Sequence, residues 1–344
     1  MKNQTSTGSR LLKASLLGLG AWWITKEAMK RSRRIDLRGR TVLITGGSRG
    51  LGLVLARQFA KCGARIAICA RDAEELRLAE TDLESDGGHV HTFTCDLRDP
   101  KQIADLVDQV ESTCGPIDVL VNNAGTIIVG SAQTMEIEDF QEAMDVNFWG
   151  AVHTTLAVMP KMKARGFGRI VNIASIGGKM PVPHLAPYCA SKFALVGFST
   201  TMRAELAKDG VLITTVNPGL MRTGSPRNAD FKGKHEAEYA WFSIGDSLPG
   251  ISMSAERAAH RIVDAAIHGE AEVTLGLPAK IGSGFYRLFP NLQIETAALA
   301  NRLLPRAEGE TEKKPGRHSE SWITRSFLRV LGHKAERNYN QLQT

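Results

Sequence analysis

The chain has 344 residues, 43% hydrophobic and 23% charged, a composition that excludes a disordered or fibrous protein and allows one large domain with tails or two modest domains. Its formal net charge of +7 would suit a nucleic-acid partner if it were spread over the fold, but it is not. Residues 1–40 carry ten basic and two acidic side chains, residues 301–344 carry nine and five, and residues 41–300 carry 24 and 29. The positive charge lies in the tails, where it favours an anionic membrane surface, and we expect no nucleic-acid partner.

The cysteines indicate a reducing compartment. The five of them, Cys62, Cys69, Cys95, Cys114 and Cys189, are scattered without the spacing of a metal site. An odd, unpatterned set is typical of reduced thiols, so we expect a cytoplasmic protein without a metal.

The N-terminal segment, residues 1–40, combines an apolar run with basic residues. The run Ala14–Ile24 has eleven residues, well short of the roughly 20 that span a bilayer. Trp22 and Trp23 stand where a signal peptidase needs small residues. The helical spacing of Leu12, Leu16, Leu19 and Trp23 leaves two interpretations open: a helix on the membrane surface, or a helix packed on its own domain or a partner subunit.

From Thr41 onward, strand and helix patterns alternate with short connections. Strands are expected at Thr41–Thr45, Arg65–Ala70, His89–Cys95, Ile117–Asn122, Arg169–Ala174 and Ile213–Asn217, and helices after Gly50 and near Ala73–Ser85, Lys101–Cys114, Glu136–Met162, Tyr188–Lys208 and Ser254–His268. This alternation predicts an α/β fold, a doubly wound Rossmann-type parallel sheet flanked by helices on both faces.

A glycine-rich turn joins the first strand to the first helix. It contains Gly46, Gly50 and Gly52, and a turn without Cβ atoms lets a pyrophosphate approach the amides at a helix N-terminus. Arg71 directly follows the second strand and can pair with a 2′-phosphate together with Arg49 from the glycine turn. The two arginines favour NADP(H), although Asp72 would be able to take the ribose hydroxyls of NAD instead.

An acid/base site is indicated by Ser175, Tyr188 and Lys192. Tyr188 and Lys192 stand four residues apart at the start of a predicted helix, so both side chains lie on the same helix face and can reach the same small volume. A nearby ammonium favours the phenolate, and the Ser175 hydroxyl would hold a substrate oxygen beside the phenol. An isolated Tyr-x-x-x-Lys is usually only an amphipathic helix surface, so the neighbouring motifs must decide.

Seven motifs in order resemble the single-domain branch of the short-chain dehydrogenase/reductase family over about residues 40–275. They are Thr45-Gly46-x-x-x-Gly50-x-Gly52, Asp96-Leu97, Asn122-Asn123-Ala124-Gly125, Asn147, Ser175, Tyr188-x-x-x-Lys192, and Pro218-Gly219 with Thr223. The resemblance implies a general acid/base (Tyr188), a lysine that holds the nicotinamide ribose and lowers the phenol pKa (Lys192), a substrate-binding serine (Ser175) and an asparagine of a proton relay (Asn147). It also implies cofactor contacts from Gly46, Ser48, Arg49, Gly50, Leu51, Gly52, Asp96, Leu97, Asn123, Ala124, Gly125, Pro218, Gly219 and Thr223, besides Arg71, Tyr188 and Lys192.

We therefore expect an NADP(H)-dependent oxidoreductase that interconverts a ketone or aldehyde and an alcohol by hydride transfer. The alternative is a regulatory protein that binds NADP(H) on the same fold without turnover. A methyltransferase does not account for Tyr188-x-x-x-Lys192 or Asn122-Asn-Ala-Gly125. The resemblance also implies a homo-oligomer.

The remaining segments are assigned by their composition. The catalytic domain is expected at 41–276, an apolar helical extension at 277–305, a flexible linker at 306–321, and a basic amphipathic helix at 322–344 with Ile323, Phe327, Val330 and Leu331 on its apolar face. Met180, Val182, Pro183 and Leu185 would form an apolar substrate wall beside His184, which we interpret as a loop residue, and Leu220–Gly250 would form an aromatic lid or a subunit contact. We expect an apolar carbonyl or alcohol substrate and, through the tails, peripheral contact with the cytoplasmic face of a membrane. For the tail helix, docking on the body or on another subunit is the open alternative.

Overall fold

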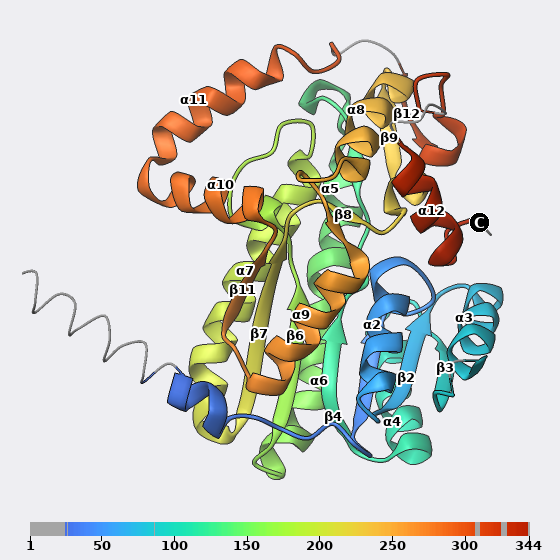
Figure 1. Ribbon diagram of the computed structural model, residues 1–344, viewed down its shortest axis with the longest axis vertical. Coiled ribbons are helices and arrows are strands. Elements are labelled where there is room, and N and C mark those ends of the chain that lie inside the picture. Colours follow the sequence, from blue (N-terminus) through green and yellow to red (C-terminus); the bar gives the residue numbers. More distant parts are fainter. Residues whose placement is uncertain (1–24, 26, 86, 307–309, 325–328, 343–344) are drawn as a thin grey trace, which may run out of the picture.

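The protein is organised around one parallel sheet. A computed structural model describes residues 25, 27–85, 87–306, 310–324 and 329–342. Seven parallel strands run in the order β11-β7-β6-β4-β1-β2-β3 (Figure 1). Their bounds are β1 Thr41–Thr45, β2 Arg65–Ala70, β3 Val90–Thr94, β4 Ile117–Asn122, β6 Gly168–Ile173, β7 Val211–Pro218 and β11 Glu272–Leu275.

Helices cover both faces of this sheet. One face carries α2 (Gly50–Lys61), α3 (Ala73–Ser85) and α9 (Ala255–His268), and the other carries α4 (Pro100–Cys114), α6 (Gly150–Ala164) and α7 (Ala186–Leu206). Successive side chains of a strand point to opposite faces. Within β1, Val42 and Ile44 accordingly pack on the first set of helices and Leu43 on the second. The apolar runs of the sequence are continuous because both faces are buried, which confirms the doubly wound fold.

The strand order places a crevice between β1 and β4. The chain moves outward from β1 to β2 and β3, and then returns to β4 on the other side of β1. The connections that leave β1 and β4 therefore diverge at the carboxyl ends of these strands, which is where doubly wound sheets bind their ligands.

Two features of the sheet layer differ from the sequence-based prediction. The long helix expected at Glu136–Met162 is divided into α5 (Ile137–Met144), a π-turn (Asp145–Trp149) and α6. The strand β11 was not expected, because its short sequence Glu-Val-Thr-Leu offers little pattern before it pairs with β7.

The expected lid and the expected linker are both ordered parts of the body. Residues 220–250 form β8 (Met221–Arg222), β9 (Asp230–Gly233) and α8 (His235–Ser247), and β8 pairs with β10 (Met253–Ser254). Within the expected linker 306–321, β12 (Glu310–Pro315) pairs with β9, which also pairs with β5 (Ile128–Val129). Backbone pairing and the ion pairs of Lys313 with Asp139 and Glu142 fix this polar stretch, which composition alone makes look flexible.

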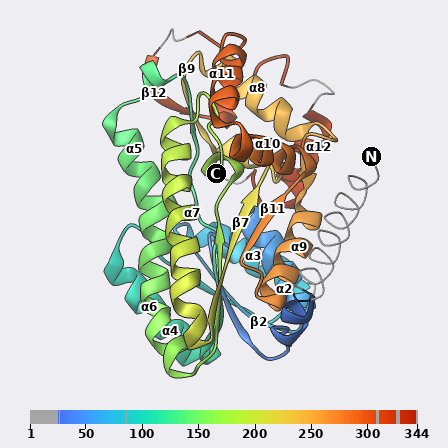
Figure 2. The same cartoon turned by 90° about the vertical axis from the view of Figure 1, so that its left-hand side faces the viewer.

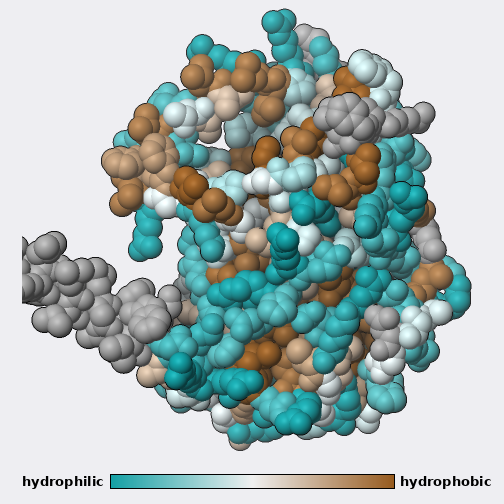
Figure 3. All heavy atoms as spheres, in the orientation of Figure 1, coloured by the Kyte–Doolittle hydropathy of each residue, from teal (hydrophilic) through white to brown (hydrophobic). Residues whose placement is uncertain are grey.

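The apolar extension forms an arm. It consists of α10 (Leu277–Leu288) and α11 (Pro290–Asn301), which follow β11 and project from the carboxyl end of the sheet (Figures 1 and 2). Leu277, Ile281 and Leu288 are 69%, 63% and 72% exposed. Figure 3 shows apolar side chains gathered on the arm and a hollow between the arm and the body.

The tail helix α12 (Val330–Asn338) docks on the body, so the docking alternative holds for the residues described. The expected apolar face is wrong, since Val330 is 58% exposed and Leu331 is also exposed. The buried face instead consists of Gly332, Ala335 and Glu336. Residue Phe327 and the N-terminal run Ala14–Ile24 lie outside the described residues. Among the described residues, no helix is long and apolar enough to cross a membrane.

Candidate active site

Ser175, Tyr188 and Lys192 meet beyond the carboxyl end of β6. Ser175 follows this strand, and its Oγ accepts the Gly177 amide at 3.1 Å, which starts a short 3-10 turn. Tyr188 lies in the first turn of α7, and the Ser175 side chain stands close enough to its phenol to lower the Tyr188 pKa. The Nζ of Lys192 lies 5.7 Å from the centroid of the Tyr188 ring. A hydroxyl, a phenol and an ammonium thus share one small volume.

Burial dominates the protonation of this site. It raises the pKa of Tyr188 to about 12, an effect that the Ser175 side chain partly opposes. It also lowers the pKa of Lys192 to about 8. We expected Lys192 to lower the phenol pKa, but here the desolvation of Tyr188 outweighs any such effect, and the Lys192 ammonium is engaged with the Ile173 carbonyl at 2.9 Å.

Asn147 reaches the same region because the π-turn redirects it. Its Nδ2 donates to the Thr126 carbonyl and to the Ser191 Oγ, each at 3.0 Å, and its Oδ1 accepts the Thr126 amide at 2.8 Å. A Cβ on Gly125 would lie 2.8 Å from Asn147 Oδ1 and 3.6 Å from Lys192 Nζ. Position 125 therefore requires glycine, and π-turns of this kind are frequent at functional sites.

The ends of β1 and β4 are tied together beneath the crevice. The Asn123 amide donates to Thr45 Oγ1 at 3.0 Å, and its Nδ2 donates to the Gly46 carbonyl at 3.0 Å. Gly46 has a φ of +62°, and a Cβ there would lie 2.8 Å from the Cα of Ala124. These contacts give Asn123 and Ala124 a structural role in addition to their expected place beside the cofactor.

The glycine turn has the form of a phosphate cradle. A Cβ on Gly52 would lie 2.0 Å from the Gly46 carbonyl oxygen, so this glycine allows the helix α2 to pack against the turn. Gly50 has a φ of +56° and stands at the start of α2, whose first turn has no acidic residue. Gly50 is thus the position at which an anion can approach the helix N-terminus.

The comparison of sequences identifies the family. Residues 40–232 match the short chain dehydrogenase family. The chain belongs to this family. The match covers more than half of the chain and confirms the family resemblance.

Several relatives of the chain are oxidoreductases by name. An uncharacterized oxidoreductase of Mycobacterium tuberculosis is 36% identical over 239 residues, which cover 67% of this chain and 65% of that protein. A ketoacyl reductase of Nostoc is 40% identical and covers 53% of this chain and 64% of that protein. A fatty acyl-CoA reductase of Acinetobacter baylyi is 33% identical over 285 residues, which cover 81% of this chain and 91% of that protein. The chain thus spans slightly less than two thirds of the mycobacterial relative.

Two solved structures share the fold and hold a nicotinamide cofactor. A variant of the actinorhodin polyketide ketoreductase, solved with NADPH, is 34% identical with a TM-score of 0.62, and the match covers 69% of this chain and 95% of that one. A metagenomic short-chain oxidoreductase in complex with NADP is 28% identical with a TM-score of 0.57, covering 70% and 97%.

A carboxylate that the sequence analysis missed lies beside the glycine turn. Glu75 is 5% exposed; its two oxygens accept hydrogen bonds from Ser48 Oγ and Arg49 Nη1, each at 2.8 Å. Asp72 Oδ1 accepts the Glu75 amide at 2.9 Å and so caps α3, while Arg71 is exposed. The sequence signal was the Asp-x-x-Glu spacing, which is typical of a helix start. Arg49 is therefore neutralised by Glu75, and Asp72 has a structural role.

The remaining residues expected to bind the cofactor have the following contacts in the structure. The carboxylate of Asp96 pairs with Arg98, which lowers the Asp96 pKa, and Leu97 packs against Gly150. On the other side of the crevice, the Gly219 amide donates to the Leu275 carbonyl at 2.9 Å, and Thr223 is buried. Pro218 ends β7, and Leu51 is buried in the first turn of α2.

His184, in the loop between Ser175 and α7, belongs to a buried polar chain. Its Nδ1 lies 2.7 Å from Glu238 Oε1, and Glu238 Oε2 accepts the Trp241 Nε1–H at 2.7 Å. Because Glu238 and Trp241 lie on α8, this chain fixes the helix against the loop that leads to Tyr188. Among the described residues, no group of His, Cys, Asp and Glu side chains has the arrangement of a metal site.

Proposed function

We propose that the protein is an NADP(H)-dependent oxidoreductase that interconverts a ketone or aldehyde and an alcohol. The observation that carries this proposal is the convergence of Ser175, Tyr188 and Lys192 beyond β6, next to the crevice at β1 and β4. The chain offers a hydroxyl to hold an oxygen, a phenol to exchange its proton and an ammonium to fix a ribose. A purely regulatory protein would not need this set.

The cradle fits a dinucleotide. Gly50 has no Cβ at the N-terminus of α2, where a phosphate would approach, and the tie between β1 and β4 leads from there toward the Tyr188 site. When bound, the cofactor supplies or accepts the hydride. Ser175 and Tyr188 would hold the carbonyl oxygen, and Tyr188 would deliver the proton as negative charge develops there. Asn147, fixed by Thr126 and Ser191, would hold a water that returns the proton.

The phosphate preference rests on Arg49 and Arg71. Arg71 is exposed at the end of β2, where a 2′-phosphate would lie, and the relatives solved with NADPH and NADP support the same cofactor. Asp72 is engaged in capping α3, which disfavours its binding of ribose hydroxyls. Glu75 acts in the opposite direction, because its carboxylate already pairs with Arg49.

The substrate is proposed to be an apolar carbonyl compound. The arm helix α10 borders the loop between Ser175 and α7, since a Cβ on Gly282 would lie 3.0 Å from the sulfur of Met180 in that loop. The same helix reaches the nicotinamide side, where a Cβ on Gly219 would lie 3.0 Å from the Ala279 Cβ. An exposed apolar arm beside both positions suits a long acyl or aromatic group, and relatives named as ketoacyl and fatty acyl-CoA reductases agree with this class. Oligomerisation and peripheral membrane contact remain part of the proposal.

The proposal is tested by assaying a panel of carbonyl compounds with NADPH, on the wild type and on Tyr188→Phe. We expect the wild type to oxidise NADPH with at least one apolar carbonyl, and the variant to lose roughly a hundredfold or more in kcat while its NADPH affinity stays the same. Fluorescence titration with NADPH checks the affinity. Tight NADPH binding without turnover across the panel would instead support the NADP(H)-sensing regulator.

A further inference from the structure

The C-terminal residues Tyr339, Asn340 and Gln341 lie on the glycine turn. The Gly50 amide donates to the Tyr339 carbonyl at 2.8 Å, and the Asn340 Nδ2 donates to the Ser48 carbonyl at 3.0 Å. Three residues from the far end of the chain therefore contact the turn that begins the fold.

The contact falls on the position where a pyrophosphate would approach. A Cβ on Gly50 would lie 2.7 Å from Gln341 Nε2, so this amide occupies the space that the missing side chain leaves. The Gly50 amide, a donor at the helix N-terminus that would face a phosphate oxygen, is already used by the Tyr339 carbonyl oxygen. The Tyr339 carbonyl oxygen thus accepts the hydrogen bond that a phosphate oxygen would accept from the Gly50 amide.

The same residues bridge to the opposite wall of the crevice. Gln341 Nε2 donates to the Thr223 carbonyl at 3.1 Å, and Gln341 Oε1 accepts from Asn228 Nδ2 at 2.6 Å. Gln341 is buried. The segment therefore spans the crevice from the glycine turn to the loop after β8, across the path of a bound dinucleotide.

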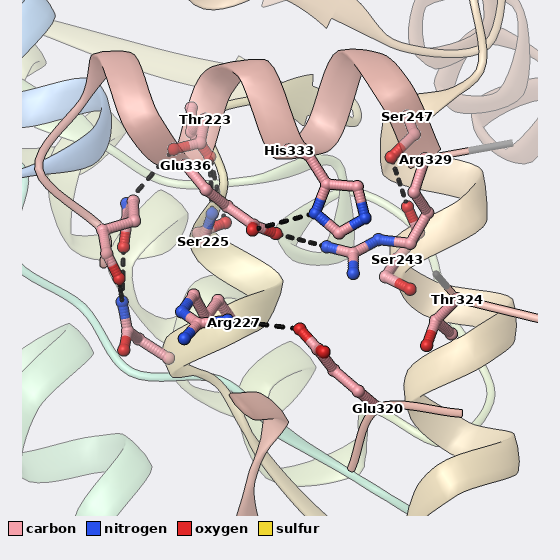
Figure 4. A network of polar contacts seen from close by, with 12 residues as sticks. Thr223, Ser225, Arg227, Ser243, Ser247, Glu320, Thr324, Arg329, His333 and Glu336 are labelled. Atoms are coloured by element: carbon pink, nitrogen blue, oxygen red, sulfur yellow. Dashed lines mark hydrogen bonds and ion pairs between the residues drawn. The ribbon is translucent and has the colours of Figure 1, made fainter. Parts of the chain in front are cut away.

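The helix α12 holds this segment in place. Arg329 pairs with Glu336, and both side chains are buried (Figure 4). The Arg329 guanidinium lies 4.9 Å from the centroid of the Tyr239 ring. The Tyr339 hydroxyl donates to Glu256 on α9. Gly224 admits the helix, since a Cβ there would lie 2.8 Å from the Cα of Glu336. The docking is specific, because it uses a buried charge pair and close backbone approach rather than an apolar stripe.

We propose that residues 339–341 are an internal occupant of the pyrophosphate subsite, which NADP(H) must displace in order to bind. The docking of α12 then sets the affinity for the cofactor. This inference rests on the proposed function, because it needs the glycine turn to be the cofactor cradle. The apparent affinity for the cofactor falls in proportion to the fraction of molecules in which the subsite is free. If the segment occupies the subsite in about nine molecules of ten, NADP(H) binding is about tenfold weaker.

The test compares the full-length wild type with the double variant Asn340→Gly, Gln341→Ala. Asn340 has a φ of +55°, so glycine preserves the backbone there while removing the side chain. Arg337→Ala, on the exposed side of α12, is the matched control. We expect the double variant to bind NADPH about tenfold more tightly than the wild type and the control. Adenosine 2′-monophosphate, which lacks a pyrophosphate, should bind all three proteins equally.

Hydrogen exchange provides a readout that does not depend on the variants. Saturating NADPH should increase amide exchange in residues 330–342 of the wild type, whereas adenosine 2′-monophosphate should not. Equal NADPH affinities for all proteins, weaker binding by the double variant, or a tail that NADPH protects would each overturn the inference while leaving the proposed function intact. If neither ligand bound any of the proteins, the cofactor site itself would be wrong and both proposals would fall.

Discussion

Glu75 is the charged side chain that bears most directly on the choice between NADPH and NADH. Its carboxylate pairs with Arg49 and accepts from Ser48, next to the expected 2′-phosphate position. We expect Glu75→Gln to improve the NADPH affinity about tenfold over that for NADH, because the change removes a negative charge and releases Arg49 to bind the phosphate. Fluorescence titration with both cofactors measures the ratio.

A matched control is available on the same helix. Glu74 is exposed and pairs only with Arg77 in the described structure, so Glu74→Gln makes the same charge change away from the glycine turn. It should leave the cofactor ratio unchanged. An equal shift in both variants would show a general charge effect, and a loss of NADPH binding in Glu75→Gln would show that Glu75 mainly orders the turn.

Asp246 should make stability depend on pH. It is buried on α8, and burial raises its pKa to about 7. The Met221 amide and the charges of Arg329 and Arg222 lower this pKa, but by less than burial raises it. Because the folded-state pKa lies above the unfolded value, the stabilisation is full below about pH 4 and is lost as the pH rises to about 7. Asp246→Asn should remove this loss, about 2–4 kcal/mol.

Urea unfolding at pH 5 and pH 8 measures this effect. The wild type should lose more free energy of unfolding between these two values than Asp246→Asn does, whereas Asp105→Asn, at an exposed position on α4, should behave as the wild type. Equal pH dependence in all three proteins would mean that Asp246 is ionised in the folded protein at both values.

At the level of elements, the sequence predicts what local residues determine and fails where contacts between distant residues decide. The turn from β1 to α2 was predictable, because its glycines follow a buried apolar run directly. The π-turn at Asn147 was not, since it depends on hydrogen bonds to Thr126 and Ser191 from other elements. The face by which α12 docks was wrongly predicted for the same reason: it contains Glu336, which only its partner Arg329 makes compatible with burial.

The arm is an element whose role can be tested separately. Leu277, Ile281 and Leu288 fall at i, i+4 and i+11 on α10, so they share one exposed face. We expect Ile281→Asp with Leu288→Asp to raise KM for a long-chain carbonyl about tenfold and to leave KM for a short one unchanged, because only the long chain would reach the arm. Steady-state kinetics with a chain-length series provides the measurement.

Thr296→Asp is the control for this prediction. Thr296 lies on α11, is exposed and bonds to the helix backbone at Gln293, so the change adds a charge to the arm without touching the apolar face of α10. A parallel rise of KM for short and long substrates in the double variant would indicate damage to the site. An unchanged KM for both would remove the arm from the substrate path.

Across the whole molecule, positive charge and exposed apolar groups are segregated from the acidic body. Residues 1–40 carry a net charge of +8 and residues 41–300 a net charge of −5. The first described residues and the arm lie on the same side of the molecule in Figure 1. The N-terminal run itself lies outside the described residues, so its position has to be measured. The charge pattern favours contact of the N-terminal segment with an anionic surface.

Vesicle flotation is the measurement that decides between membrane contact and protein contact. If the N-terminal segment lies in the membrane interface, the full-length protein should float with phosphatidylserine vesicles at low salt, and binding should weaken as salt rises above about 0.1 M, where exposed charges are screened beyond about 10 Å. Trp22→Ser with Trp23→Ser should weaken binding at every salt concentration, because it removes buried apolar area rather than charge. Neutral vesicles are the control. If the wild type stays unbound at low salt, and the tryptophan variant instead changes from a larger to a smaller species in size-exclusion chromatography, the segment packs on a partner subunit.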